Sequence, residues 1–475
     1  MNDLPAQGHV HLIAICGVGM AALAGLLQSQ GYRVTGSDQN VYPPMSTYLT
    51  ELGIQVLSGY REEHLKERPE LVVVGNAVSR NNPEVQAVLR LGVPYISFPH
   101  AIGRFLIVSK RSIVTVGTHG KTTTTALLAW VLAKAGWDPS FFIGGIPVDF
   151  DSGFKQGGGT WVVLEGDEYD SAFFDKGPKF LHYRPEKVIL TSLEFDHADI
   201  YPDLDHLKGA FLRLMEIIPP SGTLLVCNEY GAAKDVAAAA RCPVMFYGDG
   251  EPRDWQARNV RVHEGRSLFE PFYRSRSEGV VSIGLIGRYN ISNALAAYAI
   301  GRELGLERGV LVEGLVTFSG VKRRQEVKGE AGGIMVIDDF AHHPTAVQET
   351  IEGVRAAYPG RRIWAIFEPR SNTSRRRIFE NEFSQTLGRA DRIVVAGLYQ
   401  PEKIPEGDRL SPAKVVQEIN RLYGDSRAVF VEKADEISPY VIEEAKSGDV
   451  IVVMSNGGFG GVQEKILRAL ETKMA

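Results

Sequence analysis

The sequence predicts an α/β fold divided into three domains. Short apolar segments alternate with helical patterns along the chain, which is typical of parallel sheets that carry helices on both faces. The length of 475 residues exceeds what one hydrophobic core usually organises. We expect a Rossmann-like domain, a central P-loop-type domain with a small β insertion, and a second Rossmann-like α/β domain, at residues 1–109, 110–325 and 326–475.

The first domain is predicted from three strand-like segments and one helical pattern. Strands are expected at residues 9–16, 32–37 and 71–74, and a helix at residues 20–30. A polar, proline-containing stretch at residues 94–110 separates these elements from the next apolar strand. For this reason the first domain boundary is placed near residue 110.

The same alternation continues through the other two domains. In the second domain we expect strands at residues 111–116, 161–164, 188–192 and 223–227. One helix is expected between the last two of these strands, and another begins near Asn290. Short β segments at residues 252–286 form the predicted insertion. After residues 322–324 the third domain begins, with a helix from Pro344 and strands at residues 334–338, 362–367, 392–396 and 450–453.

The composition limits the class of protein. Charged residues make up 23% of the chain and hydrophobic residues 44%, as in a soluble globular enzyme. The net charge of −5 gives no electrostatic reason to expect nucleic-acid binding or membrane association. Three cysteines are too few for a disulfide framework, and the sequence shows neither a signal peptide nor a long apolar run. We expect a cytoplasmic protein, without membrane insertion, that is a monomer or a weak homodimer.

A glycine-bracketed Lys-Thr follows the strand at residues 111–116 and opens a helical pattern. Gly117 and Gly120 let the backbone approach a phosphate, and the N–H groups at the helix start attract negative charge. Lys121 adds a positive charge, and the Thr122 hydroxyl can ligate Mg²⁺. The usual ATPase motif has four residues between its glycines, whereas this loop has two, so it is a variant cradle. The alternative is a helix start with an incidental lysine.

A second glycine-rich turn follows the first strand. The run from Gly17 to Ala22 has the spacing of a dinucleotide-binding fingerprint with alanine in the third glycine position, and Asp38 ends the next strand. This pattern predicts a nucleotide diphosphate at the helix N-terminus, but it does not separate NAD from a UDP-sugar. A nicotinamide oxidoreductase is therefore one alternative, and a purely structural turn is another.

Acidic residues follow two strands of the second domain. Directly after the strands at 161–164 and 188–192 come two runs, Glu165-Gly-Asp-Glu-Tyr-Asp170 and Glu194-Phe-Asp-His-Ala-Asp199. Parallel sheets bind ligands at the carboxyl ends of their strands, so these runs can hold metal ions that offset charge on a transferred phosphoryl group. A solvated acidic surface and a structural His197 are the alternatives.

Three further segments are placed near a cleft or a hinge. Asn290 and Asn293 at a helix start are either caps or contacts to a base or phosphate. At the proposed hinge, residues 322–324 are all basic, and at least one of them is expected to be a solvated charge. His342 and His343 follow a strand end, and adjacent histidines are poorly spaced for one metal, so a nucleotide contact is expected for one of them.

Taken together, these motifs resemble the Mur ligase family. Its ATP-binding motif, Gly-Thr-x-Gly-Lys-Thr/Ser, matches Gly117 to Thr122 and uses the same shortened loop. The resemblance covers the whole chain, and four segments are similar to the members that add a peptide to UDP-N-acetylmuramate: residues 37–46, 194–200, 368–373 and 455–461. Members that add L-alanine usually carry a Gln-Pro-His-Arg-type segment where this chain has Glu368-Pro369-Arg370.

The resemblance implies an ATP-dependent amide ligase that uses Mg²⁺. It would join the murein tripeptide L-alanyl-γ-D-glutamyl-meso-diaminopimelate to UDP-N-acetylmuramate through an acyl phosphate, in peptidoglycan recycling. The alternative is ligation of L-alanine to the same sugar nucleotide. The acyl phosphate must be kept from water, so we expect the third domain to close over the second with the stretch around Arg324 as hinge. Arg370, with the run from Arg375 to Arg377 expected at the next helix start, can bind the peptide carboxylates; the alternative for the run is an exposed helix face.

The resemblance also implies a set of site residues. Catalytic roles fall to Lys121, Glu165, His197 and Arg324, and metal ligation to Thr122, Glu165 and His197. The implied ATP contacts are Gly117, Thr118, His119, Gly120, Lys121, Thr122, Thr123, Asn290, Asn293, Arg324, Asp339 and His343. The UDP-sugar is expected at Gly17, Val18, Gly19, Met20 and Asp38, and the peptide at Arg370, Ser371 and Asn372.

Overall fold

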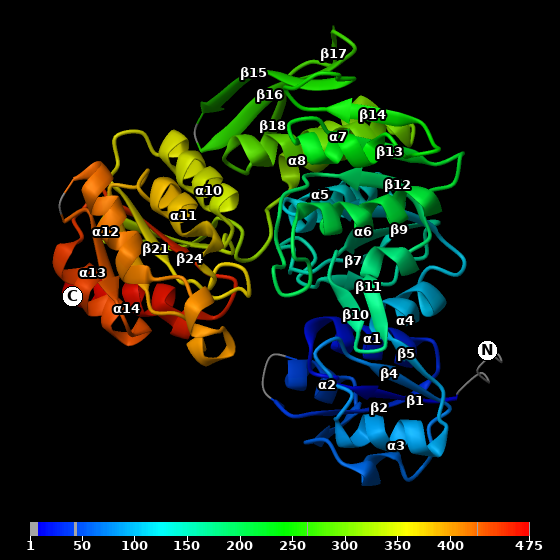
Figure 1. The fold of residues 1–475 in the computed structure, drawn as a ribbon. Helices are drawn as coiled ribbons and strands as arrows, with labels where there is room; N and C mark the ends of the chain where they lie inside the picture. The colour runs from blue at the N-terminus through cyan, green and yellow to red at the C-terminus, as the bar shows by residue number, and fades with distance from the viewer. Residues whose placement is uncertain (1–7, 42–44, 264, 425, 475) are drawn as a thin grey trace.

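The computed structural model describes residues 8–41, 45–263, 265–424 and 426–474. The chain forms three α/β domains, and the N-terminal and C-terminal domains both lie against the central one (Figure 1). This architecture is the one predicted from the sequence. Residues 42–44, part of the segment 37–46 that carries the resemblance, lie outside the described residues. The domain limits after residues 109 and 325 remain predictions.

The N-terminal domain is built on a parallel sheet in the order β3-β2-β1-β4-β5. Its strands are β1 (His9–Ile13), β2 (Arg33–Asp38), β3 (Gln55–Ser58), β4 (Leu71–Val74) and β5 (Tyr95–Ser97), and its helices are α1 (Val18–Ser29), α2 (Met45–Glu51), α3 (Pro83–Leu91) and α4 (Phe98–Phe105). The strand order reverses between β1 and β4, which is where open α/β sheets bind ligands. Residues 94–110, which were expected only to separate two domains, contain β5 and α4.

The central domain has an eleven-stranded sheet whose parallel core is β14-β13-β12-β6-β9-β7. These strands are β6 (Arg111–Val116), β7 (Ser140–Phe142), β9 (Trp161–Gly166), β12 (Pro185–Leu190), β13 (Thr223–Cys227) and β14 (Val244–Tyr247), and β8 (Phe154–Lys155) pairs antiparallel with β7. The helices are α5 (Lys121–Lys134), α6 (Leu204–Ile217), α7 (Gly231–Ala237), α8 (Arg288–Glu303) and α9 (Arg308–Thr317). A separate hairpin, β10 (Asp170–Ala172) and β11 (Asp175–Pro178), follows β9.

The predicted β insertion extends the edge of this central sheet. Its strands, β15 (Trp255–His263), β16 (Arg266–Tyr273), β17 (Arg276–Ser277) and β18 (Val281–Ile283), pair antiparallel with one another, and β15 joins β14. The insertion stands at the far end of the central domain from the N-terminal domain (Figure 1). The insertion was thus predicted correctly as β structure, while its continuity with the main sheet was not predicted.

The C-terminal domain is a six-stranded sheet in the order β19-β20-β24-β21-β22-β23, parallel except for β19. Its strands are β19 (Glu326–Ala331), β20 (Ile334–Asp339), β21 (Ile363–Phe367), β22 (Arg392–Ala396), β23 (Ala428–Val431) and β24 (Val450–Met454). Helices α10 (Pro344–Ala357), α11 (Glu380–Leu387) and α12 (Pro412–Tyr423) cover one face, and α13 (Ala434–Glu444) and α14 (Val462–Met474) cover the other. Because both faces of the sheet are covered, the inner strands β21 and β24 are buried and apolar along their whole length.

The two domain junctions differ in character. At the first junction one hydrophobic cluster runs through both domains, since Ile102 and Phe105 of α4 join Phe180 and Phe211 of the central domain. The C-terminal domain has its own clusters, although Ile286 of the central domain packs against one of them. Many of the contacts between the two domains are polar, such as the hydrogen bond that Asn372 Nδ2 donates to Asp199 Oδ2 at 2.8 Å. Polar interfaces of this kind permit domain motion more readily than apolar ones.

None of the helices in residues 8–41, 45–263, 265–424 and 426–474 has both the length and the hydropathy that a membrane crossing requires.

The first junction yields a prediction about stability. A methyl group at Gly103 of α4 would lie 2.6 Å from the His182 carbonyl oxygen, so Gly103→Ala must push α4 away from the central domain. We expect a loss of roughly 1–3 kcal/mol in unfolding free energy, measured by urea denaturation. The matched control is Gly209→Ala in α6, where nothing lies within 4 Å of the new methyl group, and it should be neutral or stabilising. Equal denaturation midpoints for the two variants would contradict this account of the junction.

Candidate active site

A cavity of about 1200 Å³ lies where the three domains meet. Its wall includes Val18 from α1, Lys121 from α5 and Asp339 at the end of β20, so every domain contributes to it. Glu165 at the end of β9 and Thr191 just after β12 also line it. The cavity therefore lies at the carboxyl edge of the central sheet, where parallel sheets bind their ligands.

The predicted phosphate cradle is the loop between β6 and α5. Gly117 has φ of 129° and Gly120 has φ of 78°, values that side chains other than glycine rarely adopt. A Cβ atom at Gly117 would lie 2.5 Å from Thr191 Oγ1, and one at Gly120 would lie 2.5 Å from Asn293 Oδ1. The shortened loop thus needs glycine at both positions, and it delivers the N-terminus of α5 to the cavity as an anion-binding site.

Lys121, Glu168 and His197 form a buried charged cluster. Lys121 Nζ donates to Glu168 Oε2 at 2.8 Å and to the carbonyl of Gly117 at 2.6 Å. On the other side, His197 Nε2 lies 2.8 Å from Glu168 Oε1. Burial alone would lower the pKa of Lys121, but the charge of Glu168 raises it well above its ordinary value. Burial would likewise raise the pKa of Glu168, yet Lys121 and His197 hold it below its ordinary value. Lys121 and Glu168 are therefore both ionised at neutral pH.

Thr122 and Glu165 supply oxygen ligands of the kind that Mg²⁺ prefers. The Thr122 hydroxyl donates to Glu165 Oε1 at 2.8 Å, and the backbone N–H of Gly144 donates to Oε2 at 2.6 Å. Burial, together with the nearby charge of Asp167, raises the pKa of Glu165 above its ordinary value. A cation beside this carboxylate would relieve that penalty, so the residues present fit a magnesium site.

His197, which contacts Glu168 and Asp196, is held in an unusual backbone conformation. Its φ of 54° is rare for a residue other than glycine, and its backbone N–H donates to Asp196 Oδ1 at 2.7 Å. Burial would lower the pKa of His197, but the hydrogen bond with Glu168 and the charges of Glu168 and Asp196 raise it to about 9. A protonated imidazole cannot bind a metal, so coordination by His197 requires the loss of that proton.

Asn290 and Asn293 are part of the cavity wall and brace the phosphate loop. Asn293 Oδ1 accepts from Thr124 Oγ1 at 3.1 Å, and its Nδ2 donates to Asn290 Oδ1 at 3.2 Å. Asn290 Nδ2 in turn donates to the Ile286 carbonyl at 2.8 Å. These bonds tie α8 to α5, so the two asparagines do more than cap a helix.

The three residues of the basic run at 322–324 lie in different environments. Arg324 Nη2 donates to Thr122 Oγ1 at 3.2 Å and its guanidinium lies 4.5 Å from the centroid of the Phe340 ring. Asp339 Oδ2 accepts the backbone N–H of the next residue along the chain, Gln325, at 2.8 Å. Arg323 is tied to the C-terminal domain, whereas Lys322 is exposed. Lys322 is thus the solvated member of the run, and Arg324 reaches the phosphate loop.

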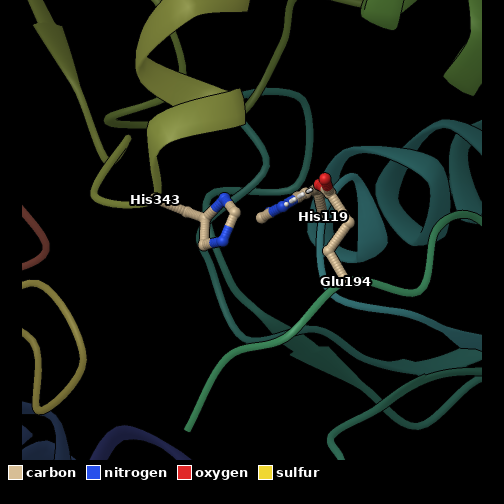
Figure 2. Close-up of side chains that lie close together, drawn as sticks. All are labelled: His119, Glu194 and His343. Atoms are coloured by element: carbon tan, nitrogen blue, oxygen red, sulfur yellow. Dashed lines mark hydrogen bonds and ion pairs between the residues drawn. The ribbon is translucent and has the colours of Figure 1, made fainter. Parts of the chain in front are cut away.

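His119, Glu194 and His343 lie together across the junction between the central and C-terminal domains (Figure 2). His119 Nε2 is 3.0 Å from Glu194 Oε2. Both ring nitrogens of His343 are engaged, since Nε2 donates to the Phe195 carbonyl at 3.2 Å and Nδ1 accepts the N–H of Thr345 at 3.3 Å. Burial, with His119 nearby, lowers the pKa of His343 to about 4, which agrees with a neutral ring. The cluster joins two domains, and His343 has no free nitrogen to offer a transition metal.

The glycine turn of the N-terminal domain faces the central domain. Gly17 precedes the first residue of α1, and Val18 is half-exposed and lines the cavity. A methyl group at Gly19 would lie 3.0 Å from Phe142 and 3.1 Å from Phe98. Gly19 is therefore required by close packing at the domain junction, independently of any ligand.

Asp38 and Met20 support this turn from within the N-terminal domain. Asp38 accepts the backbone N–H of Cys16 through Oδ2 and that of Asn40 through Oδ1, each at 2.9 Å. Met20 is buried in the core. In an NAD site the same carboxylate would accept from a ribose hydroxyl. The Asp38 contacts therefore favour a structural role in shaping the turn.

The residues expected to contact the peptide lie outside the lining of the main cavity. Asn372 contacts the central domain, and Ser371 Oγ pairs with Ser374 Oγ at 2.9 Å. Arg370 is half-buried, with its guanidinium 3.7 Å from the centroid of the Tyr399 ring. The expectation of an exposed or carboxylate-binding Arg375 is wrong, because this side chain is buried and donates to the backbone carbonyls of Tyr399 and Gln400. The run also precedes α11 and does not start it.

No sequence motif assigns a separate role to Glu168. It was one of four carboxylates in the run after β9, and only Glu165 matched a motif of the family. The sequence feature that could have pointed to Glu168 is its position in that run, three residues after Glu165. Spacing along the sequence does not show which carboxylate of the run turns toward Lys121. The contact depends on the loop that leads into β10.

Comparison with known proteins identifies the class. Three family models match successive parts of the chain: "Mur ligase family, catalytic domain" at residues 9–109, "Mur ligase middle domain" at 114–301 and "Mur ligase, glutamate ligase domain" at 323–457. The chain belongs to the Mur ligase family of ATP-dependent ligases.

Individual relatives make the likeness more specific. The chain is 39% identical over 466 residues to the UDP-N-acetylmuramate–L-alanyl-γ-D-glutamyl-meso-2,6-diaminoheptandioate ligase of Escherichia coli K12, covering 98% of each chain. It is 34% identical over 458 residues to the UDP-N-acetylmuramate–L-alanine ligase of Carboxydothermus hydrogenoformans, covering 96% of each. The crystal structure of a murein peptide ligase from Psychrobacter arcticus 273-4 matches with a TM-score of 0.71 and 35% identity, covering 98% of this chain and 99% of that one.

The geometry of the cradle predicts the effect of removing its lysine. We expect Lys121→Ala to lower kcat by roughly 100-fold or more, because a fixed positive charge at the phosphates is lost. The fold should persist, since Glu168 keeps His197 as a partner, and circular dichroism would verify this. Lys176→Ala is the matched control, because Lys176 pairs with Asp170 at the surface of the same domain. Turnover of Lys121→Ala near that of the unmodified protein would remove the cradle from the mechanism.

Proposed function

We propose that this protein joins the tripeptide L-alanyl-γ-D-glutamyl-meso-diaminopimelate to UDP-N-acetylmuramate at the expense of ATP, in peptidoglycan recycling. Family membership supports the reaction type, and the relative at 39% identity supports the choice of peptide over L-alanine. Within the structure, the proposal rests on one observation: the phosphate cradle opens into a cavity that all three domains line. Three domains around one cavity suit a reaction with three substrates.

The proposed reaction has two steps. The lactyl carboxylate of the sugar nucleotide attacks the γ-phosphorus of ATP, forming an acyl phosphate and releasing ADP. The peptide amine then attacks the acyl carbon, and inorganic phosphate leaves as the amide forms. Lys121, fixed at the start of α5, would bind the β- and γ-phosphates and stabilise the charge that develops during transfer. Arg324 would reach the same phosphates from the hinge.

Thr122, Glu165 and, once deprotonated, His197 would hold Mg²⁺. The ion would neutralise charge on the phosphoryl group as it is transferred. The first two side chains already contact each other, and His197 is fixed beside them through Glu168. The three side chains all line the same cavity, and binding of the ion would require His197 to lose its proton.

The remaining predicted site residues are proposed to bind one of three groups: ATP, the UDP part of the sugar nucleotide, or the peptide. For ATP these are Gly117, Thr118, His119, Gly120, Thr123, Asn290, Asn293, Asp339 and His343. The UDP part would lie over the start of α1, with Gly17, Val18 and Gly19 nearest to it and Met20 and Asp38 supporting the turn. For the peptide, Arg370 is the proposed carboxylate contact, while Ser371 and Asn372 would fix its loop.

Contacts between the central and C-terminal domains would keep water from the acyl phosphate. The side chains of His343 and Asn372 both bond to the central domain, as does Thr373, whose hydroxyl accepts the N–H of Ala198 at 3.2 Å. The stretch around Arg324 would act as the hinge, and the positive φ of Arg323 and Gln325 on either side of it supports a change of backbone conformation there. The free thiols of Cys16, Cys227 and Cys242, together with the use of ATP, support a cytoplasmic location.

An oxygen-transfer experiment tests the acyl phosphate. With ¹⁸O in the lactyl carboxylate of UDP-N-acetylmuramate, we expect label in the inorganic phosphate released, detected by mass spectrometry, because the carboxylate oxygen bonds to phosphorus in the first step. A reaction without sugar nucleotide serves as the control for ATP hydrolysis. Turnover that leaves the phosphate unlabelled would rule out this mechanism.

The choice of acceptor is tested by kinetics. We expect kcat/KM for the tripeptide to exceed that for L-alanine by roughly 100-fold or more, since a site built for several carboxylates leaves polar groups unpaired around a small acceptor. ADP release should depend on UDP-N-acetylmuramate as well. Equal or better use of L-alanine would assign the alternative activity, that of the relative at 34% identity.

A further inference from the structure

The Glu168 carboxylate contacts both Lys121 and His197 at the proposed phosphate site. Lys121 Nζ lies 2.8 Å from Oε2 and 3.2 Å from Oε1, and His197 Nε2 lies 2.8 Å from Oε1. The residue is 1% exposed, so these contacts form in a place with little water. Neither the family motif nor the predicted metal ligands account for it.

We propose that Glu168 is a positioning residue with two tasks. It occupies Lys121 until the phosphates of ATP arrive, and it holds His197 in the orientation that allows metal binding. This inference rests on the proposed function in so far as Lys121 is taken to be the phosphate ligand. It adds a residue that prepares the site without touching the substrates.

The first task follows from the bonds of Lys121. Its ammonium group donates to the Gly117 carbonyl and to Glu168, both on the protein. An incoming phosphate oxygen must replace one of them, and the carboxylate is the acceptor that competes by charge. Glu168 therefore weakens the binding of ATP while it keeps the lysine charged and extended. Its removal should leave ATP affinity unchanged or improved.

The second task follows from the geometry of His197. A carboxylate accepts hydrogen bonds, so the ring nitrogen that faces Glu168 is the protonated Nε2. Nδ1 makes no hydrogen bond to another group among the described residues, and it is the nitrogen left for a metal. Metal-binding histidines commonly donate their second N–H to a carboxylate, and loss of that partner costs roughly 10–100-fold in metal affinity or activity.

The loop that carries Glu168 is fixed independently of its carboxylate. Tyr201 donates its hydroxyl to the Glu168 backbone carbonyl. One residue earlier, Asp167 accepts from the partly buried Lys179 at 2.8 Å. A change confined to the carboxylate should therefore leave the backbone in place, and Glu168→Gln keeps the size of the side chain.

The test measures binding and catalysis separately in Glu168→Gln. ATP affinity is measured by titration calorimetry and Mn²⁺ affinity by electron paramagnetic resonance, with neither sugar nucleotide nor peptide present. We expect the Kd for ATP to be equal to or below that of the unmodified protein. The Kd for Mn²⁺ should rise, and kcat fall, by roughly 10-fold or more. Asp170→Asn is the matched control, since Asp170 belongs to the same acidic run but pairs with surface Lys176.

A double-mutant cycle separates positioning from general damage. If Glu168 acts on the metal through His197, the change to Gln should have no further effect on Mn²⁺ affinity in a His197→Ala background. An equal loss of Mn²⁺ affinity in the unmodified and the His197→Ala backgrounds would overturn the proposal. So would a tenfold weaker ATP affinity with unchanged kcat. A Glu168→Gln variant that cannot be distinguished from Asp170→Asn would overturn it as well. If Glu168→Gln does not fold, Glu168→Asp takes its place, because the shorter carboxylate cannot reach both Lys121 and His197. This variant must also keep its ATP affinity while its Mn²⁺ affinity and kcat fall.

These binding measurements do not depend on the identity of the sugar or the peptide. A failure of the tripeptide to react would therefore count against the proposed function and leave the Glu168 result standing. If the unmodified protein ligates the tripeptide but Glu168→Gln does not show the expected ATP and Mn²⁺ affinities, only the role of Glu168 would be overturned.

Discussion

Lys121 carries a charge at a position from which the protein excludes most water, and Glu168 is the partner that permits this. Burying an ammonium group without an anionic partner would cost several kcal/mol, and burying a carboxylate without a cationic partner would cost a similar amount. The pair solves both problems, and His197 completes it. The arrangement keeps Lys121 charged in a low-dielectric site, where the proposed interaction with a phosphoryl group would be strongest.

The same constraint explains how the domains are joined. The N-terminal domain shares a hydrophobic cluster with the central domain, which fixes the glycine turn relative to the cradle. The C-terminal domain contacts the central domain largely through polar groups, and it brings Asp339 and His343 to the cavity wall. A rigid junction on one side and an openable one on the other suit a site that must admit charged substrates and then exclude water.

Much of the fold follows from local pattern. The alternation of apolar segments and helical periods predicted the strands and the three-domain architecture, because buried parallel strands are apolar along their whole length. The stretch at residues 94–110 was not recognised, since α4 is short and its apolar face is completed only by the central domain. The role of Arg375 was also missed, because sequence does not show that its guanidinium turns inward to backbone carbonyls.

The sequence by itself determined the phosphate loop, the family and the positions of Lys121, Thr122, Glu165 and His197 at strand ends or a helix start, because those features depend on residues close together in the chain. Only the tertiary structure decided which groups meet across loops and domains. The contact of Glu168 with Lys121 and His197 spans separations of 47 and 29 residues. Its geometry comes from packing around the cavity, and local sequence carries no record of that packing.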